Sequence, residues 1–169
     1  MGAAERVTYI RANYLDASAI IKVLVEEPDS SLVVEYFKGP HLFYMTSLCF
    51  AEALGVLKAK YFHHNQITEK GYLNRSYRLT GWVRDRRVKL DEVPLTEPKV
   101  FEEVEAIVKK YHIDTSDALQ IVTIKNGNFS NFSGESQSLL ITADGDLAKA
   151  ARNEGLIVWD CVREPSPKS

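Results

Sequence analysis

The chain has 169 residues, of which 45% are hydrophobic and 26% are charged. This length and composition suit one globular domain with its own core and leave too little chain for two. The formal net charge of -2 excludes a protein that is basic over its whole surface, but it leaves room for a local basic patch.

The two cysteines, Cys49 and Cys161, lie far apart and form no Cys-x-x-Cys pair. Neither a disulfide framework nor a zinc site is indicated, and we expect reduced, buried thiols. No apolar run is long enough to span a bilayer, and residues 1–6 lack the apolar region of a signal peptide. We therefore expect no membrane contact and a cytoplasmic location.

The first elements place an acid between a strand and a helix. Residues 1–12 form a polar lead, either an extension or an extra edge strand, and a short strand then ends at Asp16. An apolar helix follows over 19–25 and stops before Pro28. At such a position Asp16 either caps the helix or, in a parallel α/β sheet, faces the ligand crevice at the carboxyl ends of the strands.

A second acid lies in the next strand and helix. After a helix over 32–37, the apolar run 41–46 is typical of a strand, and Ser47 is expected to cap a long helix over 48–62. Glu52 lies in the second turn of that helix among apolar neighbours. It is either a solvated surface residue or a core-facing acid that needs a partner.

The following helix, capped by Thr68 and reaching about Trp82, leads into a basic segment. Its cations are Lys70, Arg75, Arg78, Arg84, Arg86, Arg87 and Lys89, with Tyr72, Tyr77 and Trp82 between them. Only Glu69 and Asp85 oppose these charges, so the segment is a candidate for binding a phosphate backbone and stacking bases. The alternative is an ordinary solvated helix face whose aromatic rings belong to the core.

The third and fourth acids follow the same pattern. A strand over 88–93 and a helix from Pro98 precede an apolar helix with Asp117 in its first turn, where the helix dipole favours a negative charge. Asp114 or Thr115 can cap that helix. A polar stretch over 126–138 indicates a long surface loop, either a lid or an insertion.

Near the carboxyl terminus, a buried-type strand over 139–142 runs into Asp144, and a helix follows over 147–153. A last strand is expected over 156–162, and 164–169 is expected to be a disordered tail. Strands that alternate with helices predict an α/β fold, here one domain over 13–163. Its central, twisted, mostly parallel sheet has about four to five strands flanked by helices.

The four acids Asp16, Glu52, Asp117 and Asp144 all lie where a strand or loop passes into a helix. They can therefore converge at one end of the sheet. Clustered carboxylates repel one another unless a cation joins them, and an all-oxygen set favours Mg²⁺ or Mn²⁺ over zinc. Such a site can acidify a water and neutralise charge on a phosphodiester, which favours hydrolysis of a nucleic-acid backbone.

Four short motifs, in this order, resemble the PIN domain family and, within it, the VapC-type ribonuclease toxins. They are Tyr14-Leu15-Asp16-Ala17-Ser18, Ser47 through Ala51-Glu52, Asp117-Ala118-Leu119, and Thr142-Ala143-Asp144 followed by Leu147-Ala148. The resemblance covers nearly the whole chain and implies an endoribonuclease that depends on Mg²⁺ or Mn²⁺. The metal ligands and catalytic acids would be Asp16, Glu52, Asp117 and, more weakly or through water, Asp144.

The same resemblance assigns supporting hydrogen bonds to Ser18 and Thr142, and Asp114 is expected to have a capping or supporting role. It also implies an RNA substrate, a homodimer and, for a toxin, a cognate antitoxin. Two alternatives stay open: an RNA-processing nuclease without an antitoxin, and a non-catalytic RNA-binding or scaffolding domain. A receiver domain, a haloacid-dehalogenase phosphatase and a dinucleotide enzyme would each need a different motif after the first strand.

Overall fold

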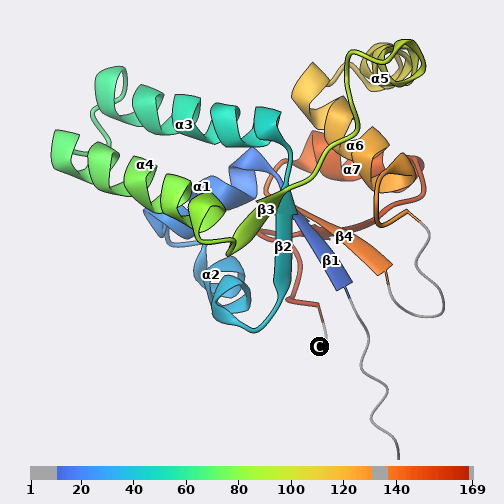
Figure 1. Ribbon diagram of the computed structural model, residues 1–169. Coiled ribbons are helices and arrows are strands. Elements are labelled where there is room, and N and C mark those ends of the chain that lie inside the picture. Colours follow the sequence, from blue (N-terminus) through green and yellow to red (C-terminus); the bar gives the residue numbers. More distant parts are fainter. Residues whose placement is uncertain (1–10, 131–136, 168–169) are drawn as a thin grey trace, which may run out of the picture.

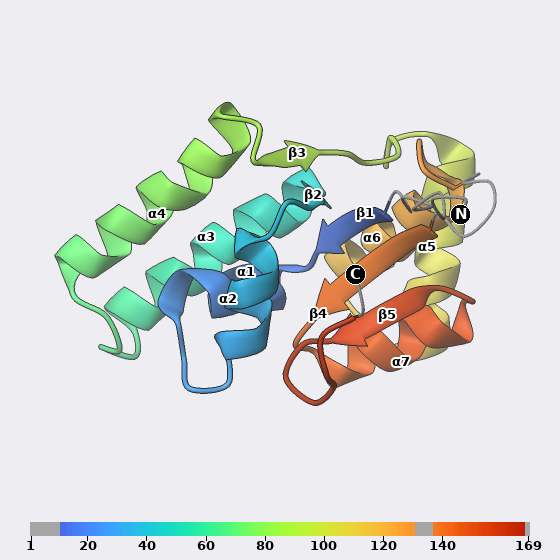
Figure 2. The same cartoon turned by 90° about the horizontal axis from the view of Figure 1, so that it is seen from below.

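The computed structural model describes residues 11–130 and 137–167, and five strands in these residues form one sheet. The strands are β1 (Arg11–Leu15), β2 (Leu42–Met45), β3 (Val88–Leu90), β4 (Gln137–Thr142) and β5 (Ile157–Asp160). Their spatial order is β3-β2-β1-β4-β5, and all neighbouring pairs are parallel (Figure 2). The predicted α/β fold class is confirmed.

The first strand of the chain lies at the centre of the sheet. Ala12 pairs with Leu42 of β2 on one side and with Ser138 of β4 on the other. The chain therefore runs outward in one direction through β2 and β3 and in the other through β4 and β5. Ligand crevices of open parallel sheets form where the strand order reverses in this way, which here is the carboxyl end of β1.

Helices cover both faces of the sheet (Figure 1). One face packs against α1 (Ala17–Val25), α2 (Ser31–Lys38), α3 (Ser47–Phe62) and α4 (Glu69–Arg84). The other packs against α5 (Pro98–Tyr111), α6 (Thr115–Asn126) and α7 (Gly145–Asn153). The helices α3 and α4 form a hairpin that extends away from the sheet (Figure 1).

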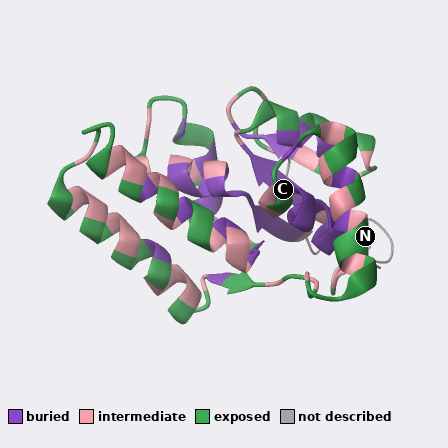
Figure 3. Ribbon diagram, turned by 90° about the horizontal axis from the view of Figure 1, so that it is seen from above, coloured by how far each residue is buried: buried purple, intermediate pink, exposed green. Residues whose placement is uncertain are grey.

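Alternation along β1 explains why two cores form. Leu15 belongs to the core under α1 to α4, whereas Ala12 and Tyr14 belong to the core under α5 to α7. Successive side chains of a strand point to opposite faces, so one buried strand supplies both cores. Buried residues accordingly concentrate in the sheet and on the inner faces of the helices, and exposed residues mark the outer sides of α3 and α4 (Figure 3).

Two local predictions are wrong. Thr46, not Ser47, caps α3, because the Thr46 side chain accepts the backbone N–H of Cys49 while Ser47 hydrogen-bonds to Glu92. The strand predicted over 88–93 ends at Leu90, since Glu92 turns toward the start of α3. The two cysteines are free and buried, as predicted.

Parts of three predicted segments lie outside the described residues: 1–10 of the lead, 131–136 of the polar loop and 168–169 of the tail. Within the described part, β1 already begins at Arg11 and β4 at Gln137. The Glu164 carbonyl accepts a hydrogen bond from Trp159 Nε1 at 3.2 Å, and its carboxylate pairs with Arg152 at 2.5 Å. The folded chain therefore extends through Glu164.

Candidate active site

The four acids come from separate elements that meet at the carboxyl end of the sheet. Asp16 directly follows β1, and Asp144 lies two residues after β4. Glu52 belongs to the second turn of α3, and Asp117 to the first turn of α6. The amino-terminal ends of α3 and α6 both lie at this end of the sheet (Figure 1).

Asp16 is the most enclosed of these acids, with 3% of its surface exposed. Its Oδ2 accepts the backbone N–H of Ser18 at 3.1 Å and the hydroxyls of Ser18 and of Thr142, the latter at 3.0 Å. Its Oδ1 accepts Nε2 of Gln120 at 3.0 Å. Asp16 thus caps α1, which is one of its two predicted roles. Its hydrogen bonds also join β1 to β4 and α6.

Ser18 and Thr142 act as hydrogen-bond relays between the two strand ends. The Ser18 hydroxyl accepts the backbone N–H of Ala143, and the Thr142 hydroxyl accepts that of Asp144, both at 2.9 Å. Each hydroxyl also donates to Asp16, so neither is free to rotate. The hydrogen bonds expected of these residues are present, and their support of a metal ligand stays a prediction.

The charges of the other acids act on Glu52 and Asp117. Glu52 accepts the Ser116 hydroxyl at 2.9 Å, which links α3 to α6. Burial, followed by the nearby acids, raises the pKa of Glu52 against the opposing effect of that hydrogen bond. The pKa of Asp117 rises to about 8, first because of burial and then because of the charges of Asp16, Glu52, Asp144 and Asp114. The predicted acids are therefore close enough to repel one another.

Asp144 and Asp114 lie at the exposed rim of this cluster. Asp144 caps α7, because its Oδ1 accepts the backbone N–H groups of Asp146 at 2.8 Å and Leu147 at 3.2 Å. Asp114 occupies the cap position of α6, and its backbone carbonyl accepts the N–H of Ala118 at 3.0 Å, but its side chain makes no capping hydrogen bond. Its carboxylate therefore contributes charge to the cluster without satisfying a helix end.

The structure adds three residues that the sequence analysis missed. Ser116 holds Glu52, Gln120 holds Asp16, and Glu92 accepts the backbone N–H of Ser47 at 2.8 Å, which fixes the start of α3. One signal was available for Gln120. It is an isolated amide in an otherwise apolar stretch of a helix that begins with a candidate acid, and such a residue needs a buried partner.

Within the described residues, no three His, Cys, Asp or Glu side chains stand ready to hold a metal ion. The carboxylate of Asp144 accepts a hydrogen bond from its own helix, and that of Glu52 accepts one from Ser116. The donor set nevertheless fits a hard divalent cation. It offers carboxylate oxygens of matched chemistry, the charges of neighbouring acids raise the pKa values of Glu52 and Asp117, and a cation would relieve that repulsion.

The basic segment divides into two kinds of arginine. Arg75 donates to the backbone carbonyl of Leu24 at 3.1 Å, and Arg87 donates to those of Phe37, Gly39 and His41. These two side chains hold α4 and β3 against α1 and α2. Arg84 pairs with Asp85 on the surface. Of the five predicted RNA-binding arginines, Arg78, Arg84 and Arg86 are exposed, and RNA binding by this set stays a prediction.

The sequence matches the PIN domain family over residues 14–153, and the chain belongs to this family. PIN domains are nucleases, typically metal-dependent, and PIN nucleases bind RNA. No curated protein matches the chain. Among the described residues, no helix combines the length and apolar character needed to cross a membrane.

Proposed function

We propose that this protein is an endoribonuclease that hydrolyses RNA phosphodiester bonds with Mg²⁺ or Mn²⁺. One observation supports the proposal: in a PIN domain, the charges of Asp16 and Glu52 act on Asp117 at the carboxyl end of a parallel sheet, where separate elements bring these acids together. A cluster of carboxylates at this position is suited to a cation that also binds a substrate phosphate.

Asp16, Glu52 and Asp117 would hold the cation directly, and Asp144 would hold it more weakly or through water. When bound, the cation acidifies a water molecule and neutralises charge that develops on the phosphodiester. The protein's own contribution is orientation. Ser18 and Thr142 fix the Asp16 carboxylate, and Asp114 adds negative charge at the rim.

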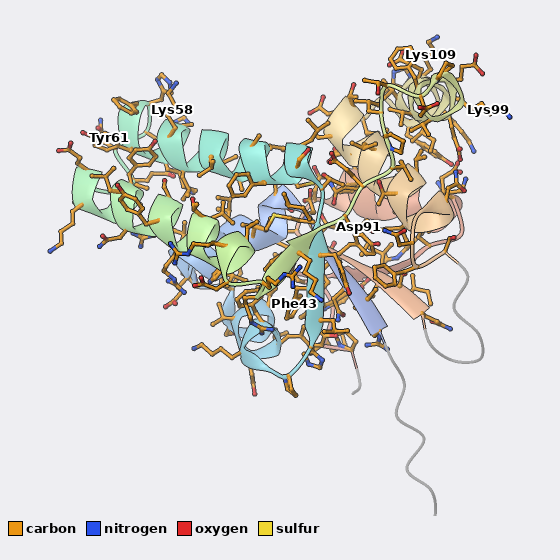
Figure 4. The ribbon with its side chains drawn as sticks, viewed as in Figure 1. Phe43, Lys58, Tyr61, Asp91, Lys99 and Lys109 are labelled. Carbon is orange, nitrogen blue, oxygen red and sulfur yellow. The ribbon has the colours of Figure 1, made fainter. Side chains whose placement is uncertain are left out.

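RNA would approach the acids over a surface that offers few cations to bind its phosphates. Lys58 lies toward the far end of α3, near Tyr61, and Lys109 extends outward from α5 (Figure 4). Arg84 and Arg86 precede β3, so they lie at the amino ends of the parallel strands, away from the acids. We therefore assign to Arg78, Arg84 and Arg86 phosphate contacts that are remote from the cleavage site.

The test is cleavage of a mixed, structured RNA pool by the purified protein with Mn²⁺ or Mg²⁺. Controls are EDTA and Asp117→Asn, which removes one ligand charge and keeps the shape of the side chain. We expect cutting that EDTA abolishes and that Asp117→Asn lowers by about 100-fold or more, because even an indirect metal partner is worth about 10- to 100-fold. Cutting that survives both controls would contradict the proposal.

The biological setting belongs to the same proposal. We favour a cytoplasmic toxin that forms a homodimer and is inhibited by a cognate antitoxin, with an RNA-processing nuclease lacking an antitoxin as the alternative. Growth arrest on expression, relieved by a small protein from a neighbouring gene, would support the toxin. A protein that binds neither Mn²⁺ nor Mg²⁺ would instead be a non-catalytic RNA-binding or scaffolding domain.

A further inference from the structure

Gln120 is a buried amide at the acid cluster, and one of its polar atoms has no partner. It lies on α6 one turn after Asp117, and 1% of its surface is exposed. Its Nε2 donates to Asp16 Oδ1 at 3.0 Å, whereas its Oε1 is buried without a hydrogen bond in the described part of the chain. Two further oxygens in the described residues are buried without a hydrogen bond. They are the hydroxyl oxygens of Ser30, at the start of α2, and of Ser76, in the middle of α4.

The chemistry of Asp16 fixes how this amide is oriented. An ionised carboxylate only accepts hydrogen bonds, so the NH₂ end of Gln120 must face it and the oxygen must face elsewhere. Leaving a buried acceptor unpaired costs free energy. An apolar side chain, such as those of Leu119 and Ile121 beside it on α6, would avoid that cost. The hydrogen bond to Asp16 accounts for the NH₂ end of the amide, but among the described residues the fold supplies no partner for its oxygen.

Gln120 lies beside two of the proposed metal ligands, Asp16 and Asp117. Residues three apart on a helix lie on the same side, so Gln120 and Asp117 approach the centre of the cluster together. Oδ2 of Asp16 already has three donors, from Ser18 and Thr142, while Oδ1 has Gln120 as its donor. A carboxylate oxygen has two lone pairs, so Oδ1 keeps one for a cation while its orientation stays fixed.

We propose that Gln120 is a positioning residue of the metal centre, which holds Asp16 Oδ1 at a set spacing from Asp117 and reserves Oε1 as an acceptor for a water that enters with the cation. This inference rests on the proposed function. Mg²⁺ requires near-ideal octahedral geometry and keeps several waters, so a fixed carboxylate and a nearby acceptor both favour its binding. Partners of metal ligands act in this way by orienting them.

The experiment is calorimetric titration of the full chain with Mn²⁺, comparing wild type with Gln120→Met. Methionine fills a similar volume but neither donates nor accepts as the amide does. We expect the dissociation constant for Mn²⁺ to rise by about tenfold. The free energy of unfolding without metal should also fall, because the buried Asp16 Oδ1 loses its hydrogen-bond donor.

Thr123→Val is the matched control. Thr123 is buried on the same helix, three residues further on, and its hydroxyl accepts the backbone N–H of Val93 at 3.2 Å. This variant should lower the free energy of unfolding and leave Mn²⁺ affinity unchanged. A comparable loss of Mn²⁺ affinity in Thr123→Val would show a general structural effect and overturn the inference.

The remaining outcomes are also decisive. Equal Mn²⁺ affinity in wild type and Gln120→Met would overturn the role of Gln120 while leaving the proposed function intact. A wild type that binds no Mn²⁺ would overturn the proposed function itself, and this inference with it. If Gln120→Met does not fold, Gln120→Asn replaces it, since the shorter amide cannot reach Asp16 and should weaken Mn²⁺ binding in the same direction.

Discussion

The two ends of the sheet treat a carboxylate in opposite ways. At the carboxyl end, burial and four neighbouring acids raise the pKa of Asp117 to about 8. At the far end of α7, Glu154 accepts hydrogen bonds from Lys125, Tyr111 and Lys110, which lower its pKa to about 2. One end stabilises a negative charge, whereas the other gathers negative charges that repel one another.

Glu154 is a structural tie between three helices. Its carboxylate meets Lys125 Nζ of α6 at 2.8 Å, and Lys110 Nζ and the Tyr111 hydroxyl of α5 at 2.9 and 2.6 Å. Among the described residues, no salt bridge joins a cation to the acids around Asp117. Local rules of stability are commonly broken at functional sites, and this contrast is consistent with the site proposed above.

The largest expected effect comes from a cation that relieves the repulsion among the acids at the carboxyl end of the sheet. Mn²⁺ at about 100 times its dissociation constant should raise the free energy of unfolding of the wild type by about 2.7 kcal/mol. Asp117→Asn should abolish most of this gain. Without metal, the same variant should be more stable than wild type by about 1 kcal/mol, because one of the repelling charges is gone. Urea unfolding with and without Mn²⁺ measures both, and equal metal-induced gains in the two proteins would contradict the prediction.

Removing the charge of Glu154 at the opposite end of the sheet should lower the free energy of unfolding by a comparable amount in the absence of metal. Glu154→Gln should lower the free energy of unfolding by about 2 kcal/mol, less than the pKa shift alone suggests because the Lys110 side chain is 61% exposed. Asp85→Asn is the matched control, since its pair with Arg84 lies on the surface. That control should leave the free energy of unfolding nearly unchanged. Similar effects of the two substitutions would show that Glu154 is an ordinary surface acid.

The Glu154 contribution should also depend on pH with a defined sign. The folded pKa of about 2 lies below the ordinary value of 4.5, so the folded state binds fewer protons in this window. The stabilisation is therefore fully present above the ordinary pKa and is lost as pH falls through the folded one. We expect the difference between wild type and Glu154→Gln to stay constant from about pH 7 to 5 and to shrink below that. A difference that widens on acidification would be the wrong sign.

The fold and the acids were predictable because their signals are local. Asp16, Asp117 and Asp144 each stand where an apolar strand or a loop passes into a helix, and parallel strands place such positions at one edge. The structure confirms the sheet and brings the acids within electrostatic reach of one another. Their catalytic roles are a prediction that the experiments above test.

The partners of these acids could not be read from the sequence. Gln120 meets Asp16 across 104 positions, and Ser116 meets Glu52 across 64. Arg75 and Arg87 read as surface cations, yet both donate to carbonyls at the ends of distant helices. The same side-chain chemistry serves a surface or an interior, and only tertiary packing decides which.

The smallest expected effect lies one turn beyond Glu52 on α3. Gly55 is exposed in mid-helix, has a negative φ, and a Cβ there would meet nothing within 4 Å. Gly55→Ala should therefore raise the free energy of unfolding by about 0.5 to 1 kcal/mol and leave Mn²⁺ affinity unchanged. Gly127→Ala is the opposing control, because its Cβ would lie 2.4 Å from the Thr123 carbonyl oxygen and should destabilise α6. If Gly55→Ala instead weakens Mn²⁺ binding, the backbone of α3 beside Glu52 must move when the cation binds. The carboxyl end of the sheet would then be less stable because of this helix as well as because of its repelling charges.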